Sequence, residues 1–212
     1  MKKLTILIFS ILFTLSTTAF AGGMIGVKYG NGDLEGNSKS YTAGSTAYAA
    51  QSGSKDNEFG AIFAEVNIKE SPISVGLEYV PFDADISLDG RNSSEQSANV
   101  SDYTTLYALA MHELNEVSVY AKLGYSMADI GTVKPNDGQT TINSSSDSLE
   151  GMMYGVGVQS KELPFGLVAR AEYTFTEFDD ISVTTTSNGS ASVKKTADGD
   201  LTTLTISLAK SF

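Results

Sequence analysis

Apolar residues recur at every second position in eight segments of this chain, and this period-two pattern constrains the fold more than any other feature of the sequence. Alternate side chains of an extended chain point to opposite faces, so a strand with one apolar face produces this spacing. The segments lie at about 24–30, 58–69, 73–82, 102–114, 117–128, 150–160, 165–177 and 200–212. We therefore expect an all-β protein.

The two faces of each segment differ in chemistry. In the segment at 117–128, Val119, Ala121 and Leu123 share one face, while Lys122 and Gly124 share the other. In the segment at 102–114, the residues assigned to the apolar face are Tyr103, Thr105, Tyr107, Leu109 and Met111. A soluble β-sandwich also alternates in this way, so alternation alone leaves open whether the apolar face meets a protein core or lipid.

The connections between the segments alternate between short and long. The short ones lie at 69–72, 115–116 and 161–164, and the long ones, at about 31–57, 83–101, 129–149 and 178–199, are rich in Ser, Thr, Asn, Gly and Asp. Short periplasmic turns and long external loops are typical of outer-membrane barrels. This favours a single eight-stranded antiparallel up-and-down transmembrane β-barrel, with ten strands as the alternative count. An even number of strands would place both mature termini in the periplasm.

The first 21 residues resemble a secretory signal peptide. Lys2 and Lys3 precede an apolar stretch at 4–15, and Ala19-Phe20-Ala21 has the small residues of a cleavage site. The alternative, a membrane anchor, is disfavoured because an apolar run of about a dozen residues is too short to span a bilayer as a helix. We expect a leader at 1–21 and a barrel domain at 22–212.

Composition excludes several classes of function. The absence of cysteine excludes a disulfide scaffold and zinc–thiolate sites. Loss of Lys2 and Lys3 with the leader leaves 12 basic against 25 acidic residues, a formal net charge of −13. A chain this acidic is not expected to bind nucleic acid, which is recognised by positive charge.

Tyrosines near the outer ends of the strands are expected to form an aromatic girdle. Such a ring marks the boundary between membrane and water, because the phenyl ring is apolar and the hydroxyl hydrogen-bonds to water. The predicted members, all assigned to the apolar face at one height, are Tyr29, Tyr79, Tyr103, Tyr125, Tyr154 and Tyr173.

Charged residues within the segments fall mostly on the polar face. If that face is the lumen, they meet near mid-height and must be paired, because an unpaired buried charge is costly. The predicted lumen charge network is Lys28, Glu78, Lys122, Arg170 and Glu172, with Glu65 lower down and Glu78 paired with Arg170. The lumen of an eight-stranded barrel is narrow enough for side chains to fill it.

The chain resembles the small outer-membrane β-barrel proteins of the OmpA-transmembrane and OmpX type, often called the porin family. The residues that carry the resemblance are the leader ending at Ala21, the stretches 154–158 and 170–173, and the C-terminal segment 204–212. The resemblance implies a location in the outer membrane and a C-terminal signal for the barrel-insertion machinery, made by Leu204, Ile206, Leu208 and Phe212. Lys210 departs from that signal, because an apolar or aromatic residue is usual there.

Function is expected to follow from the architecture rather than from a motif. One class is a structural or surface-interaction barrel with a filled lumen, whose loops contact lipopolysaccharide or an extracellular partner; the alternative is a narrow channel for small solutes or ions. No catalytic, cofactor or metal residue is assigned. The single histidine, His112, is placed on the lumen phase without a nucleophile near it, so we expect no enzyme activity.

Overall fold

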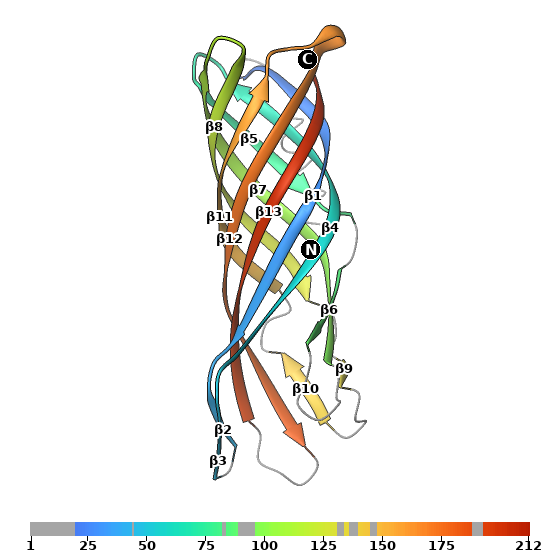
Figure 1. Ribbon diagram of the computed structural model, residues 1–212, viewed down its shortest axis with the longest axis vertical. Helices are drawn as coiled ribbons and strands as arrows, with labels where there is room; N and C mark the ends of the chain where they lie inside the picture. The colour runs from blue at the N-terminus through green and yellow to red at the C-terminus, as the bar shows by residue number, and fades with distance from the viewer. Residues whose placement is uncertain are drawn as a thin grey trace.

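The computed structural model describes residues 20–43, 45–81, 84–88, 96–130, 134–135, 140–144, 148–187 and 193–212. Its main feature is a ring of eight long antiparallel strands (Figure 1). These are β1 (Phe20–Ser38), β4 (Gln51–Ile68), β5 (Ile73–Tyr79), β7 (Gln96–Glu113), β8 (Val117–Ile130), β11 (Ser148–Ser160), β12 (Leu167–Ser187) and β13 (Val193–Ser211). The predicted leader falls mostly on 1–19, outside the described residues, whereas Phe20 and Ala21 open β1.

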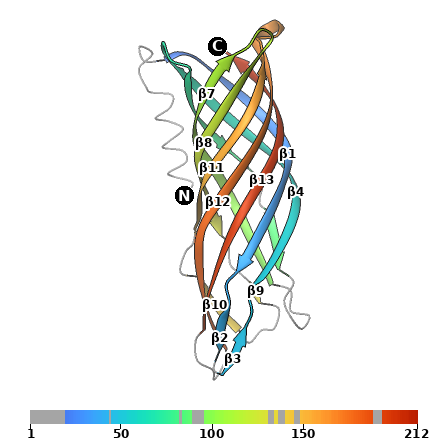
Figure 2. The ribbon, with the colours of Figure 1, turned by 60° about the vertical axis from the view of Figure 1, so that its left-hand side comes forward.

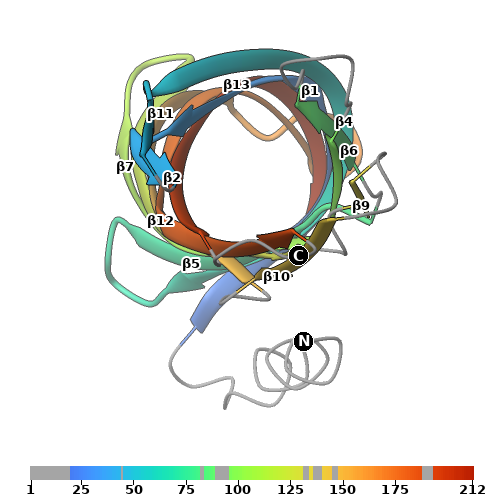
Figure 3. The ribbon, with the colours of Figure 1, turned by 90° about the horizontal axis from the view of Figure 1, so that it is seen from below.

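Each long strand pairs with the next long strand along the chain, and the pairing of β13 with β1 closes the ring. The view along the axis shows this closed wall directly (Figure 3). The up-and-down order follows from the short turns, because a turn of a few residues can only join antiparallel neighbours. The predicted eight-stranded antiparallel barrel is confirmed.

The short turns lie at the same end of the barrel as the C-terminus (Figure 1). They are tight: Leu114 N donates to Val117 O at 2.8 Å, and Glu70 adopts a left-handed φ of 59° in the β4–β5 turn. The β11–β12 turn contains a short 3-10 helix, η1 (Pro164–Gly166), in which Phe165 has a φ of 67°.

The strands continue far beyond the ranges predicted from alternation. β1 and β4 stay paired to Ser38 and Gln51, and β12 and β13 stay paired to Thr185 and Val193, so much of the expected long loops is strand. At the end opposite the C-terminus lie the small strands β2 (Tyr41–Ala43), β3 (Thr46–Tyr48), β6 (Ala84–Leu88), β9 (Lys134–Pro135) and β10 (Thr140–Ser144) (Figure 1). Alternation misses these extensions because a hairpin with water on both sides needs no apolar face.

The two faces of the ring separate by polarity. The outward phase carries the exposed apolar side chains, among them Val27, Leu123, Val156 and Ile206, while the inward phase is buried. Among the described residues, no helix is long and apolar enough to cross a membrane.

The assignment of faces in the fourth strand was wrong. In β7, Leu106 is 45% exposed and points outward, whereas Tyr107 and Leu109 are buried in the lumen. Both phases of this segment carry apolar residues, so alternation could not distinguish the outward face from the inward one. A register shift between Ser101 and Thr104, with Asp102 at a φ of 54°, also interrupts the alternation there.

Candidate functional site in the barrel lumen

The centre of the lumen holds a charge quartet, Lys28, Glu78, Lys122 and Glu172, contributed by β1, β5, β8 and β12. The ammonium group of Lys28 lies 2.5 Å from Glu78 Oε2 and 2.6 Å from Glu172 Oε1. Lys122 Nζ approaches the same two oxygens at 3.1 and 2.9 Å. Cations and anions therefore alternate, and each lysine bridges both carboxylates.

Arg170 belongs to a second layer of the lumen, not to the quartet. Its guanidinium forms a bidentate pair with Glu65, at 2.8 and 2.9 Å, and its Nε donates to Gln159 at 2.6 Å. The predicted pairing of Glu78 with Arg170 was wrong. Arg170 lies one inward position closer to the short turns than Glu172, which brings it to the level of Glu65.

Aromatic rings surround these charges and complete their hydrogen bonding. Tyr120 Oη donates to Glu172 at 3.0 Å, and Tyr107 Oη donates to Glu65 at 3.2 Å. Lys122 Nζ stands 4.0 Å from the centre of the Tyr107 ring, a cation–π distance. The rings thus connect the two charged layers and pack around them.

Three lumen rings lie directly opposite glycines of a neighbouring strand, in the pairs Phe63–Gly26, Tyr107–Gly76 and Tyr120–Gly157. The glycines make room for the rings, since a Cβ on Gly157 would lie 2.3 Å from Tyr120 Cζ. The sequence analysis missed these lumen aromatics. A usable signal was present: the glycines of the polar faces mark where a facing strand can place a large ring.

Above the quartet, on the side away from the short turns, the lumen is lined by hydroxyl groups. Thr174 and Thr203 are hydrogen-bonded at 2.7 Å, and Thr105 and Ser126 at 2.9 Å. Tyr103, predicted to join the outer girdle, donates to Ser126 at 3.0 Å and is part of this layer. Its placement follows from the inverted phase of β7.

The charged residues of the lumen neutralise one another and are not exposed to solvent. Near mid-height, the described inward-facing residues include three cations, Lys28, Lys122 and Arg170, and three anions, Glu65, Glu78 and Glu172, all buried. The residues that the structure describes contain no group of three or more His, Cys, Asp or Glu placed to hold a metal ion. His112 pairs with Val119 on the outward phase and is exposed, so its predicted place in the lumen was wrong.

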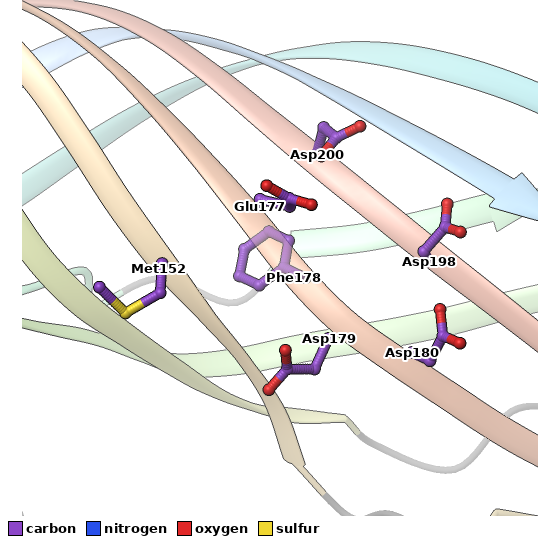
Figure 4. Close-up of a pocket in the computed structure, with 7 residues that line it drawn as sticks. All are labelled: Met152, Glu177, Phe178, Asp179, Asp180, Asp198 and Asp200. Carbon is purple, nitrogen blue, oxygen red and sulfur yellow. The ribbon is translucent and has the colours of Figure 1, made fainter.

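A hollow of about 750 Å³ lies toward the other end of the barrel, on β11, β12 and β13 (Figure 4). Its lining is acidic: Glu177, Asp179, Asp180, Asp198 and Asp200, with Met152 and Phe178. Lys39 contacts Asp180 at 2.5 Å and Asp198 at 3.9 Å, and the hydrogen bond to Asp180 raises the pKa of the Lys39 ammonium.

The sequence matches the family model described as "Outer membrane protein beta-barrel domain" over residues 4–212. The chain belongs to this family. Membership places the barrel in the outer membrane, so its outward face meets lipid and its lumen face is the interior described above. No curated protein matches the sequence.

Solved structures of outer-membrane barrels are similar to this member of the family in fold. OprG from Pseudomonas aeruginosa is 13% identical with a TM-score of 0.66, and the match covers 92% of this chain and 97% of that one. The outer membrane protease OmpT from Escherichia coli is 8% identical with a TM-score of 0.51, over 94% and 99% of the two chains. At these identities the likeness shows the fold alone.

The girdle positions of this family member lie on its lipid-facing side, except for Tyr103. Tyr29, Tyr125, Tyr154 and Tyr173 are exposed outward, and Tyr79 is half-buried on the same phase. Three hydroxyls donate to carboxylates, in the pairs Tyr29–Glu58 at 2.8 Å, Tyr79–Asp102 at 2.9 Å and Tyr125–Glu150 at 2.6 Å. These carboxylate partners were not foreseen from the sequence.

The C-terminal strand of the barrel presents Leu204, Ile206, Leu208 and Phe212 outward. The main chain of Phe212 exchanges two hydrogen bonds of 3.0 Å with Gly23. Lys210, which departs from the expected apolar pattern, donates from Nζ to the carbonyl of Phe165 in the β11–β12 turn. The lysine therefore caps a turn instead of facing lipid.

Proposed function

We propose that this outer-membrane barrel is closed to solutes and acts through its external surface, as a structural or surface-interaction protein. The observation that carries the proposal is the charge quartet. It joins strands from four sides of the ring through contacts of 2.5–3.1 Å, with aromatic rings packed around it. Buried charges paired in this way are expensive to separate, because removing one partner leaves the other uncompensated.

The proposal gives the barrel no catalytic role and no cofactor. It includes removal of the leader at 1–21, both mature termini in the periplasm, and recognition of the C-terminal strand by the insertion machinery. Lipopolysaccharide around the girdle and a partner at the external hairpins are the proposed contacts. His112 is exposed on the outward phase near the short turns, and the proposal assigns it no catalytic role.

Planar-bilayer conductance of the refolded protein tests this function. We expect little or no steady conductance from the unmodified barrel. The double change Glu78→Ala with Lys122→Ala should open a leak, because it removes half of the quartet and leaves Lys28 paired with Glu172. Removing Glu78 with Arg170 is a poorer test, since Glu65 would then lose its bidentate partner.

The matched control is Lys161→Ala with Glu162→Ala, which removes the same charges from an exposed turn. This variant should remain closed. A large steady conductance in the unmodified protein would contradict the proposal and favour the alternative, a narrow channel for small solutes or ions.

A further inference from the structure

The β2–β3 hairpin stands at the extreme end of the molecule, opposite the C-terminus (Figures 1 and 2). From the girdle residue Tyr29, β1 continues to Ser38, a path of about 30 Å at ~3.3 Å per residue. Even at a tilt of about 45°, this lifts the hairpin roughly 20 Å above the girdle, beyond a headgroup region of roughly 5–8 Å. The hairpin therefore stands well above the level of the lipid headgroups.

The hairpin presents a tyrosine stack, Tyr41 and Tyr48. The two residues face each other across the β2–β3 ladder, with ring centroids 4.8 Å apart and planes at 9°. Lys195 Nζ of β13 lies 5.0 Å from the centre of the Tyr41 ring. A backbone bond from Lys39 N to Thr196 O, at 2.9 Å, fastens the base of the hairpin to β13. The stack is thus positioned before any partner arrives.

Charge is distributed unusually around this stack. The 15 residues from 40 to 54 contain no charged side chain, in a chain with 25 acidic residues. The nearest charges in sequence, Lys39 and Lys55, both have partners of their own, and Lys39 is paired with Asp180. The neighbouring tip of β13 supplies Lys194, which is exposed, and Lys195. An anionic partner would meet repulsion over most of this acidic protein, but attraction at the hairpin.

The chemistry of the hairpin is that of an adaptable binding loop. Tyrosine offers a large rigid contact area with few rotatable bonds, while serine, threonine and glycine supply flexible hydrogen bonding. The C–H face of a sugar ring packs against an aromatic ring, and sugar hydroxyls bind serine and threonine side chains. The lysines add a preference for carboxylated, phosphorylated or sulfated sugars.

We propose that the tyrosine stack, together with Lys194 and Lys195, binds an acidic polysaccharide that lies beyond the lipid headgroups. The inference rests on the proposed function, because it assigns a partner class to the external surface.

The test measures binding of the refolded full chain, in phospholipid nanodiscs, to immobilised dextran sulfate and to unsulfated dextran. We expect binding to dextran sulfate that weakens as salt is raised, and none to dextran. Lys194→Glu with Lys195→Glu should weaken binding at least about tenfold. Tyr48→Ser should also weaken it, whereas Tyr48→Phe should retain it because the ring remains.

The matched control is Lys69→Glu with Lys161→Glu, which makes the same charge change in exposed turns at the opposite end. Equal loss in this control would overturn the proposal by showing a net-charge effect. Absence of binding, equal binding to dextran, or full binding after reversal of Lys194 and Lys195 would overturn it too. Planar-bilayer conductance of the same refolded protein separates the two ideas. A closed barrel without polysaccharide binding refutes this inference alone, whereas an open barrel refutes the proposed function.

Discussion

At the residue scale, packing in the lumen depends on glycines as much as on the large side chains that face them. Gly26, Gly76 and Gly157 lie directly opposite three large rings. The rings fit only because these three residues have no Cβ atom. In Gly76, an added Cβ would lie 2.4 Å from Tyr107 Cζ and 2.8 Å from the carbonyl oxygen of Ala64. The rings in turn hold Glu65 and Glu172 by hydrogen bonds, so the glycines control the charged layers indirectly.

Gly157→Ala should therefore destabilise the barrel, by about 1–3 kcal/mol, because the new methyl group would push the Tyr120 ring away from Glu172. A urea titration of the refolded protein measures the change. Gly36→Ala is the control, since the structure gives its added Cβ no atom within 4 Å. Equal stability of the two variants would show that the lumen repacks freely.

Ala121, outward on β8 and exposed to lipid, gives a second test. Ala121→Arg should cost about 2–4 kcal/mol, the penalty for a basic residue near the bilayer midplane. Ser54→Arg, on the exposed part of β4 beyond the girdle, should cost close to nothing. The same titration compares them, and similar costs would contradict the assigned depth of Ala121.

At the element scale, we expect the seam between β4 and β5 to be the weakest part of the ring. Within the described residues it has six register pairs, from Ile62–Tyr79 to Asn67–Ser74, whereas β8 and β11 share 13. β5 is short, and β4 continues past it toward the external end. Each strand pair adds hydrogen bonds and side-chain contacts, so opening should begin at this seam.

A disulfide across this seam should slow unfolding more than one elsewhere. Val66 and Val75 are register partners, as are Val119 and Val158 between β8 and β11. Loop entropy alone predicts about 2.7 kcal/mol for Val66→Cys with Val75→Cys and about 3.9 kcal/mol for Val119→Cys with Val158→Cys. We expect the reverse order for unfolding rates: the Val66–Val75 disulfide should slow unfolding more than the Val119–Val158 disulfide. The measurement compares the unfolding rates of oxidised and reduced protein for each pair. If the β8–β11 pair has the larger effect, the β4–β5 seam does not open first.

Much of the wall could be predicted from the sequence, because lipid on one side and a filled lumen on the other force period-two alternation. The lumen cations and anions could be placed on the inward phase for the same reason. The ion-pair partners of these charges could not be predicted. Arg170 lies only one inward position from Glu172, and the tilt of the strands decides which residues on other strands reach the same height. The faces of β7 were predicted wrongly because both of them are apolar. The external extensions of the strands were missed because neither of their faces has to be apolar.

At the scale of the whole molecule, the last residue closes the ring. Phe212 is 72% exposed, so its contribution to the fold comes chiefly from its two backbone hydrogen bonds with Gly23. Closure of the barrel removes the last open edge, which would otherwise pair with other chains.

Deleting Phe212 should cost about 1–3 kcal/mol in refolding titrations, the worth of two backbone hydrogen bonds. Phe212→Ala keeps both bonds and should refold almost normally. In cells, however, Phe212→Ala should lower the amount of heat-modifiable barrel in the outer membrane, if the ring is read during insertion. Normal insertion of Phe212→Ala would limit the role of this residue to closing the ring.

The unbroken pairing of β1 with β4, from the lipid-facing wall out to Ser38 and Gln51, has a consequence for how such a protein can change over evolution. Adding or deleting two residues on each strand preserves which side chains face in or out, whereas a change of one residue reverses them. Each permitted step moves the terminal hairpin by about 6.6 Å along the strands. The reach of this surface appendage can therefore be lengthened or shortened in fixed increments, to suit the thickness of a surrounding coat, while the membrane-embedded part stays unaltered.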